Sequence, residues 1–340
     1  MAIFCLANGE DDFINKMNKC IIAYSLENKP VYLSQLNISG AMRKIIKNAL
    51  LPNIVQTLEG NVSLVHGGPF ANIAHGCNSI IALKTAMNIA EYTVTEAGFG
   101  SDLGAEKFLD IVCDKANIKP NAIVLVVSIR SLKMHGGVKK EDLSIENTNA
   151  LVLGFENLKQ HIKNISAFNI PYIVSINSFN NDTKKEVEVL EKFLDSNNIV
   201  YAFDTSYNEG SKGGIDLANR IVSIVNNNNN SQLTPIYNKT ETLEEKVNKI
   251  CTKCYGASGI EYSDNAKLKL KELNNSNAYV CIAKTPLSLT DDEKILIIDK
   301  PFKIHVNDIV VANGADFNIA ITGNIYRMPG LPKTPEACNM

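Results

Sequence analysis

The sequence lacks several features that would place it in a protein class at once. Its 340 residues contain no tryptophan, and aromatic residues make up only 7% of the chain. No apolar run approaches the roughly 18 residues that a membrane-spanning helix needs. No basic and apolar leader precedes the acidic residues at positions 10–12. We therefore expect a cytoplasmic protein with no membrane partner.

A strong charge of one sign is also missing. Thirty-four basic residues face 36 acidic ones, so the formal net charge is −2. A chain this close to neutrality does not attract nucleic acid by bulk electrostatics, because that binding depends on a basic surface. We therefore expect no nucleic-acid partner.

Two sequence motifs of well-known catalytic sites are absent from the 340 residues. No GxxxxGK[ST] phosphate-binding loop occurs, and no GxSxG nucleophile elbow occurs. The nearest approach to a phosphate-binding loop is the segment GSKGG at 210–214, which has glycine and lysine in the wrong order. A P-loop nucleotide site and an α/β-hydrolase triad are thus not predicted within this sequence.

The eight cysteines are mostly embedded in apolar runs, which is typical of reduced, buried thiols inside cells. Cys251 and Cys254 form a single CxxC within a helical pattern, with no second pair and no nearby histidine. A structural zinc site needs four ligands of this kind. We therefore predict no zinc and no other protein-bound metal cluster.

The middle of the chain alternates short β-branched runs with amphipathic segments. The expected strands cover residues 62–65, 92–95, 122–129, 172–176 and 199–203. The expected helices cover residues 77–90, 103–116, 146–166, 182–196 and 214–225. Repeated units of this length predict an α/β fold with a doubly wound, mostly parallel sheet. The uninterrupted apolar run at 122–129 predicts a central strand that is covered on both faces.

Composition divides the chain into three expected parts. Residues 1–60 contain two helix-like stretches at 13–24 and 34–50, and residues 61–230 form the α/β domain. An asparagine run followed by Pro235 marks its end. Residues 236–340 predict a smaller α+β domain. Its helices are expected at 243–255 and 266–273, and its strands at 278–283, 303–306, 309–312 and 317–321.

Ligands in open α/β sheets bind beyond the carboxyl ends of the strands, so the loops there are the candidate site. The first loop, HGGPFANIAHG, contains Gly68, Phe70, Asn72 and His75. Its glycines would let the backbone approach an anion, and the following helix would offer free N–H groups. A tight turn with buried histidines is the alternative explanation of the same pattern.

The second loop, EAGFGSDLG, resembles a dinucleotide-binding fingerprint. Its glycines are spaced GxGxxxG rather than GxGxxG, and no acidic residue ends the next strand. A nicotinamide cofactor is therefore the weaker alternative. Glu96 and Asp102, on either side of Gly98, suit a site for phosphate and Mg²⁺. The same two carboxylates could instead cap the following helix.

The remaining three loops carry basic and aromatic side chains. Arg130, Lys133 and His135 stand beside paired glycines and could hold an anionic group, or they could form a solvated basic loop. Phe179 and Tyr207 follow the next two strands, so a planar ring could stack between them. Packing is the alternative for either aromatic residue alone. All five strand ends together predict one binding cleft.

These strand ends lie in longer strings that resemble formate–tetrahydrofolate ligase. The strings follow in order along the chain as VQTLEGNVSLVHGGPFANIAHGCNSIIALKTA, YTVTEAGFGSDLGAEKF, SIRSLKMHGGV, PYIVSINSFNNDT, CYGASGIEYS and MPGLPKTP. Their length and order make the resemblance specific to this family. It implies one-carbon metabolism: the ATP-dependent ligation of formate to tetrahydrofolate. The product would be 10-formyltetrahydrofolate, made through formyl phosphate with Mg²⁺ beside the ATP.

The resemblance also implies roles for individual residues. Phe179 matches an aromatic residue that helps to sandwich the folate ring, and Tyr207 stands where the family has a tryptophan. Phe70 lines the same cleft. The other residues implied in the cleft or near the phosphates are Gly68, Asn72, His75, Glu96, Gly98, Asp102 and Arg130.

The resemblance further implies a segment that the 340 residues do not contain. Family members carry a P-loop lysine and formate-binding residues N-terminal to the string MAIFCLA. We therefore expect the C-terminal portion of the ligase, a P-loop NTPase-like sheet without its first strands, with the catalytic residues outside this sequence. By itself this chain should show no appreciable ligase turnover.

Three interpretations of the chain stay open. It could serve the family's ligase reaction, or it could be the C-terminal half of a split ligase with a separate P-loop chain as partner. It could instead be a folate-binding or assembly module without catalysis. Because family members are often homotetramers, we expect a homo-oligomer.

Overall fold

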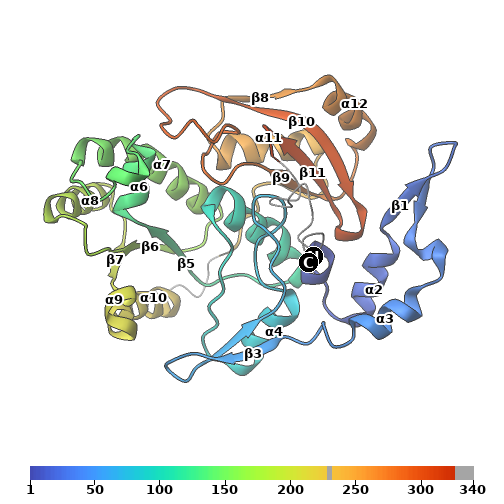
Figure 1. The fold of residues 1–340 in the computed structure, drawn as a ribbon, viewed down its shortest axis with the longest axis horizontal. Helices are drawn as coiled ribbons and strands as arrows, with labels where there is room; N and C mark the ends of the chain where they lie inside the picture. Colours follow the sequence, from blue (N-terminus) through green and yellow to red (C-terminus); the bar gives the residue numbers. More distant parts are fainter. Residues whose placement is uncertain (228–231, 326–340) are drawn as a thin grey trace, which may run out of the picture.

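The computed structural model describes residues 1–227 and 232–325. Within these ranges the strands form a three-stranded sheet, a four-stranded sheet and two hairpins. Figure 1 shows the three-stranded sheet and its helices on the left, the four-stranded sheet at the top and an N-terminal arm (residues 10–46) on the right. The parallel strands linked by helices confirm the predicted α/β class.

The middle part is built on a parallel sheet of order β5-β6-β7. Its strands are β5 (Ile123–Val127), β6 (Tyr172–Asn177) and β7 (Tyr201–Asp204). The helices around it are α6 (Ile129–His135), α7 (Thr148–Ala167), α8 (Lys184–Ser196), α9 (Ser206–Glu209) and α10 (Ile215–Asn227). Figure 1 shows α6, α7 and α8 on one side of the sheet and α10 on the other. These elements confirm the last three expected strands of the α/β domain.

Two expected strands do not join this sheet. Strand β4 (Val62–Val65) instead pairs antiparallel with β3 (Asn53–Gln56), because Gly60 closes a tight turn between them with a φ of 82°. Residues 92–95 form no strand and pair with none of the described strands. Three strand ends, and not five, therefore share one edge.

Strand β5 lies at the edge of the sheet rather than at its centre. It pairs only with β6 among the described residues, and Val124 and Val126 are 37% and 63% exposed. The apolar run predicted a strand covered on both faces, but this face of β5 lacks a cover. An exposed apolar edge strand is a liability that proteins usually protect.

The N-terminal arm holds strands as well as helices. Helix α2 (Glu10–Asn18) ends where strand β1 (Ile21–Tyr24) begins, and β1 pairs antiparallel with β2 (Pro30–Tyr32). The predicted helix over 13–24 is thus wrong beyond residue 18, because the turn with Asn28 at a φ of 59° folds β1 into a hairpin. The other helices of residues 1–60 are α1 (Ala2–Cys5), η1 (Leu33–Leu36) and α3 (Ser39–Ile46).

A long helical region links the hairpins to the parallel sheet. Helix α4 (Ile80–Ile89) begins at Ser79, whose hydroxyl accepts a hydrogen bond from the Ala82 N–H at 3.0 Å. The expected helix over 103–116 is present in three pieces, two of them π-helical. They are η2 (Gly100–Ala105), η3 (Phe108–Val112) and α5 (Cys113–Ala116).

The C-terminal part contains the predicted α+β elements. Its sheet has the order β8-β10-β11-β9, with β8 (Gly259–Tyr262), β9 (Tyr279–Ala283), β10 (Lys303–Ala312) and β11 (Phe317–Thr322). The helices are α11 (Leu243–Lys249), η6 (Ile250–Cys254) and α12 (Asp264–Leu273). Strand β10 unites the two strands expected at 303–306 and 309–312, with an irregular register between Val306 and Asp308. The short elements η4 (Lys140–Asp142), η5 (Gly210–Gly214) and η7 (Asn313–Ala315) complete the fold.

One apolar core joins the C-terminal sheet to the helical region. It contains Leu6 near the N-terminus, Ile80 in α4, Ile111 in η3, Val247 in α11 and Ile282 in β9. A second core lies between the parallel sheet and α6, α7 and α8. None of the described helices is long and apolar enough to span a membrane. The string MPGLPKTP and most of the asparagine run lie outside the described residues.

Glycine sets the spacing between α6 and α7. A Cβ on Gly154 would lie 2.7 Å from the Leu132 carbonyl carbon and closer still to its oxygen. We expect Gly154→Ala to lower the free energy of unfolding by about 1–3 kcal/mol, because the two backbones must move apart. Gly40→Ala in α3 is the matched control, since its Cβ would meet nothing within 4 Å. Urea unfolding should place Gly40→Ala at or up to about 1 kcal/mol above the parent. Equal stabilities of the two variants would contradict the close packing.

Candidate functional site

Two glycine-rich loops enclose a cavity of about 650 Å³ beside β4. Residues 66–71 and 76–78 form one wall, and residues 94–96, 98 and 99 form another. Four predicted site residues meet here, namely Gly68, Phe70, Glu96 and Gly98. Phe70 is 58% exposed, so its ring is free to contact a ligand. The structure thus brings the first two predicted loops together.

The two loops cross so closely that only glycine fits at the crossing. A Cβ on Gly76 would lie 2.6 Å from the Ala71 Cα, and one on Gly98 would lie 2.7 Å from the Gly76 carbonyl oxygen. A Cβ on Gly104 would lie 2.8 Å from the Gly98 carbonyl carbon. The GxGxxxG pattern is therefore explained by packing of the chain on itself, and it gives no support to the dinucleotide alternative. Gly68 differs, because nothing lies within 4 Å of its Cβ position.

His75 and Asn72 lie beneath the cavity rather than on its wall. Both are buried, and neither His75 ring nitrogen has a hydrogen-bond partner among the described residues. Burial, helped by the positive charge of Lys107, lowers the pKa of His75 to about 3. A neutral, buried imidazole cannot hold an anion by charge. The two residues are not among those that line the cavity, and the burial of His75 fits the alternative of a turn with a buried histidine. Their place in the cleft stays a prediction.

Asp102 faces a lysine and not the cavity. Its carboxylate is buried and lies 3.0 Å from Lys284 Nζ at the end of β9. Burial alone would raise the pKa of Asp102, but Lys284 reverses the effect and holds that pKa below its usual value. Lys284 also donates to the backbone carbonyls of Thr285, Ser288 and Thr290. In this structure the charge of Asp102 is balanced by Lys284, and its role beside a phosphate or Mg²⁺ stays a prediction.

The aromatic residues predicted for ring stacking lie apart from this cavity's lining. Phe179 follows β6, and its N–H donates to Asp182 Oδ2 at 2.8 Å. Tyr207 lies in α9 after β7 and is 87% exposed. The two loops are joined by a hydrogen bond of 2.8 Å from Asn208 Nδ2 to Asn180 Oδ1. The expected neighbourhood of these loops at one sheet edge is thus present.

Arg130 does not lie on an irregular basic loop. It belongs to the first turn of α6, which begins at Ser128 because the Ser128 hydroxyl accepts from the Ser131 N–H at 3.1 Å. Its guanidinium carbon lies 4.5 Å from the centre of the Phe179 ring. The structure therefore groups Arg130 with the aromatic loop and away from Glu96 and Gly98.

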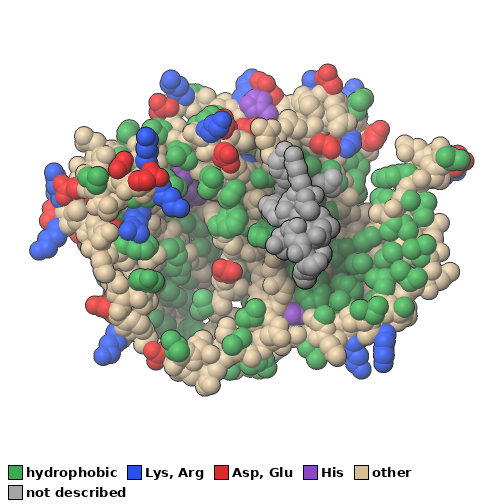
Figure 2. Space-filling view, in the orientation of Figure 1, with side chains coloured by type: hydrophobic (Ala, Val, Ile, Leu, Met, Phe, Trp, Pro, Cys, Tyr) green, Lys and Arg blue, Asp and Glu red, His purple; other side chains and the backbone are tan. Residues whose placement is uncertain are grey.

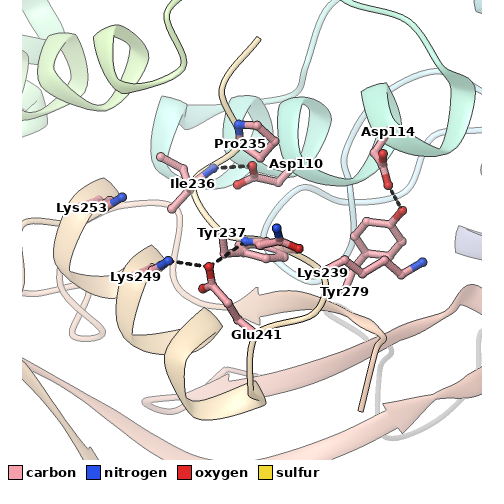
Figure 3. Close-up of a pocket in the computed structure, with 11 residues that line it drawn as sticks. Asp110, Asp114, Pro235, Ile236, Tyr237, Lys239, Glu241, Lys249, Lys253 and Tyr279 are labelled. Carbon is pink, nitrogen blue, oxygen red and sulfur yellow. Dashed lines mark hydrogen bonds and ion pairs between the residues drawn. The ribbon is translucent and has the colours of Figure 1, made fainter. Parts of the chain in front are cut away.

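A second cavity, of about 430 Å³, lies between α5, α11, β9 and the linker before α11 (Figure 3). Asp110 accepts from the Ile236 N–H at 2.8 Å, Lys249 pairs with Glu241 at 2.6 Å, and the Tyr279 hydroxyl bonds to Asp114. Burial raises the pKa of Asp110 to about 7. Because most of its polar groups bind one another, we interpret this cavity as part of a packing contact between chain segments. Its residues come from four distant segments that share no motif, so no pattern along the chain indicates it.

The described residues do not converge on a metal. No three of their His, Cys, Asp and Glu side chains are close enough to hold an ion. Cys251 and Cys254 are buried in the main core within η6, where burial raises the pKa of both thiols. The seven described cysteines are free thiols. This part of the chain therefore offers no set of ligands for Mg²⁺ by itself.

The family model described as formate–tetrahydrofolate ligase matches residues 1–340. The match spans the N-terminal arm, the two glycine-rich loops, the parallel sheet and the C-terminal part.

The buried ion pair between Asp102 and Lys284 should dominate the stability of the cavity wall. We expect Lys284→Met to lower the free energy of unfolding by about 3–5 kcal/mol, because it leaves Asp102 as an unpaired buried charge. Lys303→Met is the control, since Lys303 pairs with Glu261 at 2.8 Å but both side chains are about half exposed. That change should cost less than about 1 kcal/mol. Chemical unfolding curves with similar midpoints for the two variants would overturn this ranking.

Proposed function

The chain belongs to the formate–tetrahydrofolate ligase family, and we propose that it takes part in the ATP-dependent ligation of formate to tetrahydrofolate. In the proposed reaction, formate oxygen attacks the γ-phosphorus of ATP, which gives formyl phosphate and ADP. N10 of tetrahydrofolate then attacks the formyl carbon, and inorganic phosphate leaves. The product is 10-formyltetrahydrofolate. The observation that carries the proposal is the family match over the whole chain.

We assign folate binding to the loops after β6 and β7. A pterin ring is planar and can stack on an aromatic side chain, and such stacking is favourable in an apolar site. The Asp182 carboxylate holds the backbone of Phe179, and Tyr207 is free to approach from the neighbouring loop. A tyrosine ring offers less area than the tryptophan of the family, so we expect weaker stacking on this side.

The cavity between the glycine-rich loops is the proposed place for the reacting groups. Phe70 and Glu96 line it, and the open space at Gly68 lets a ligand approach the backbone closely. Formyl phosphate is a reactive anhydride, so the reaction requires that water be excluded. The described residues supply one predicted carboxylate to this cavity, Glu96, and no group of three ligands for a metal ion. We therefore derive no step of the reaction through Mg²⁺ from these residues.

We further propose that residues outside these 340 supply the phosphate-binding loop, as in a split ligase. No GxxxxGK[ST] string occurs in the sequence. Strand β5 has an unpaired edge among the described residues, and its Val126 is exposed. Val94, which lies just before the second glycine-rich loop in sequence, is 96% exposed. A partner strand could pair with β5 and cover such apolar side chains. These exposed residues support an additional segment but do not identify it.

The expectation of a homo-oligomer stays a proposal. Apolar side chains gather on the N-terminal arm in Figure 2, over β1, β2 and α3. The exposed ones are Ile22, Tyr24, Leu26, Leu36, Ile38 and Ile45. Contiguous exposed apolar patches are typical of surfaces that contact other proteins.

The 340-residue chain alone should give no appreciable 10-formyltetrahydrofolate from formate, MgATP and tetrahydrofolate. The reason is that it contains no phosphate-binding loop to hold the triphosphate. Adding a polypeptide that carries the family's P-loop portion should restore turnover if the split-ligase proposal is right. The measurement is the formation of product over time, with and without that polypeptide. Rapid turnover by the chain alone would refute the proposal. Folate binding without restored turnover would favour the non-catalytic module.

Folate binding should depend on the Phe179 ring. We expect the chain to bind tetrahydrofolate in a calorimetric titration and Phe179→Ala to weaken that binding about 5- to 30-fold, because one stacking surface is lost. Tyr24→Ala is the control, since Tyr24 is an exposed aromatic residue on the distant β1. It should leave the affinity unchanged. If the parent chain and both variants bind alike, the folate assignment of this loop is wrong.

A further inference from the structure

Arg130 forms no close ion pair among the described residues, although its charge opposes the rise that burial causes in the pKa of the nearby Asp182. Its guanidinium makes no ion pair within 4 Å among the described residues, and its Nε atom is buried without a hydrogen-bond acceptor there. Its guanidinium carbon lies over the face of the Phe179 ring, 4.5 Å from the ring centre. A guanidinium over an aromatic face is attracted by the ring quadrupole.

The helices on either side fix both members of this contact. Helix α6, which carries Arg130, is tied to α8 by a buried ion pair of 2.8 Å between Lys133 and Glu186. Helix α8 follows the loop that holds Phe179, and Asp182 at the end of that loop accepts from the Phe179 N–H. The arginine and the ring are therefore held on neighbouring, interlocked segments.

The Arg130 guanidinium covers one face of the half-buried Phe179 ring. A ring has two faces, and the guanidinium occupies one of them, so a planar ligand can stack only on the other. We propose that Arg130 is a positioning residue of the folate site, which holds the Phe179 ring in place and thereby fixes where the pterin stacks. The inference rests on the proposed binding of folate by this loop. It removes Arg130 from the group of phosphate-binding candidates.

Comparing single and double variants distinguishes a positioning role of Arg130, which acts through Phe179, from a direct role of Arg130 in ligand binding. The proteins to compare are the parent, Arg130→Met, Arg130→Lys, Phe179→Ala and the double variant Arg130→Met/Phe179→Ala. Calorimetry gives the dissociation constants for tetrahydrofolate and, in separate titrations, for MgATP. Arg220→Met is the control, because Arg220 on α10 pairs with Asp216 in an exposed site. Circular dichroism shows whether each variant is folded.

We expect Arg130→Met to weaken tetrahydrofolate binding about 3- to 30-fold, within the range of a cation–π contact. Arg130→Lys should recover part of this loss, and Arg130→Met should have little further effect in the Phe179→Ala background. A change confined to MgATP would assign Arg130 to the phosphates and overturn the proposal. Effects of the two single variants that simply multiply would overturn it as well. If Arg130→Met does not fold, the decision passes to Arg130→Lys, whose affinity must lie below that of the parent.

The outcomes also separate this inference from the proposed function. If the parent chain does not bind tetrahydrofolate, the proposed folate site fails and the role of Arg130 fails with it. If the parent binds and Arg130→Met binds equally well, only the role of Arg130 fails.

Discussion

The buried ion pair between Asp102 and Lys284 is the contact on which the shape of the glycine-rich cavity depends. Asp102 stands at the start of the helical region after one glycine loop, and Lys284 stands at the end of β9 in the C-terminal sheet. Because the same ammonium also binds three backbone carbonyls, it fixes the loop after β9 as well. Lys107, also buried, donates to the Ala71 carbonyl in the other glycine loop. Two buried lysines thus anchor both walls of the cavity.

Much of the fold was predictable because local patterns decide it. The β–α units of the parallel sheet were identified from periodicity, and Phe179 and Tyr207 were placed on neighbouring loops by the rule that parallel strands end at one edge. Residues 62–65 and 92–95 are both short runs rich in β-branched residues, yet the first pairs in a hairpin and the second forms no strand. Strand propensity describes a single segment and does not specify which strand it pairs with. The pairing partner decides whether the segment becomes part of a sheet.

Several residues predicted for the site have partners in the structure that the sequence did not indicate. Asp102 looked like a ligand because its loop is rich in glycine, but a lysine distant in sequence neutralises it. His75 is predicted to line the cleft, but its side chain is buried. Arg130 was grouped with the phosphates, whereas the short helix α6 directs it onto Phe179. Each of these outcomes depends on a contact between segments far apart in sequence, which spacing along the chain does not record.

We propose above all that this chain carries the folate-binding face of the ligase. Amide hydrogen exchange with and without tetrahydrofolate tests it most directly, because bound loops open less often and exchange more slowly. We expect slower exchange in the loops at 178–182 and 205–214, with a smaller effect at 66–71. Unchanged exchange in those loops, or slowing confined to the linker at 235–241 beside the second cavity, would contradict it.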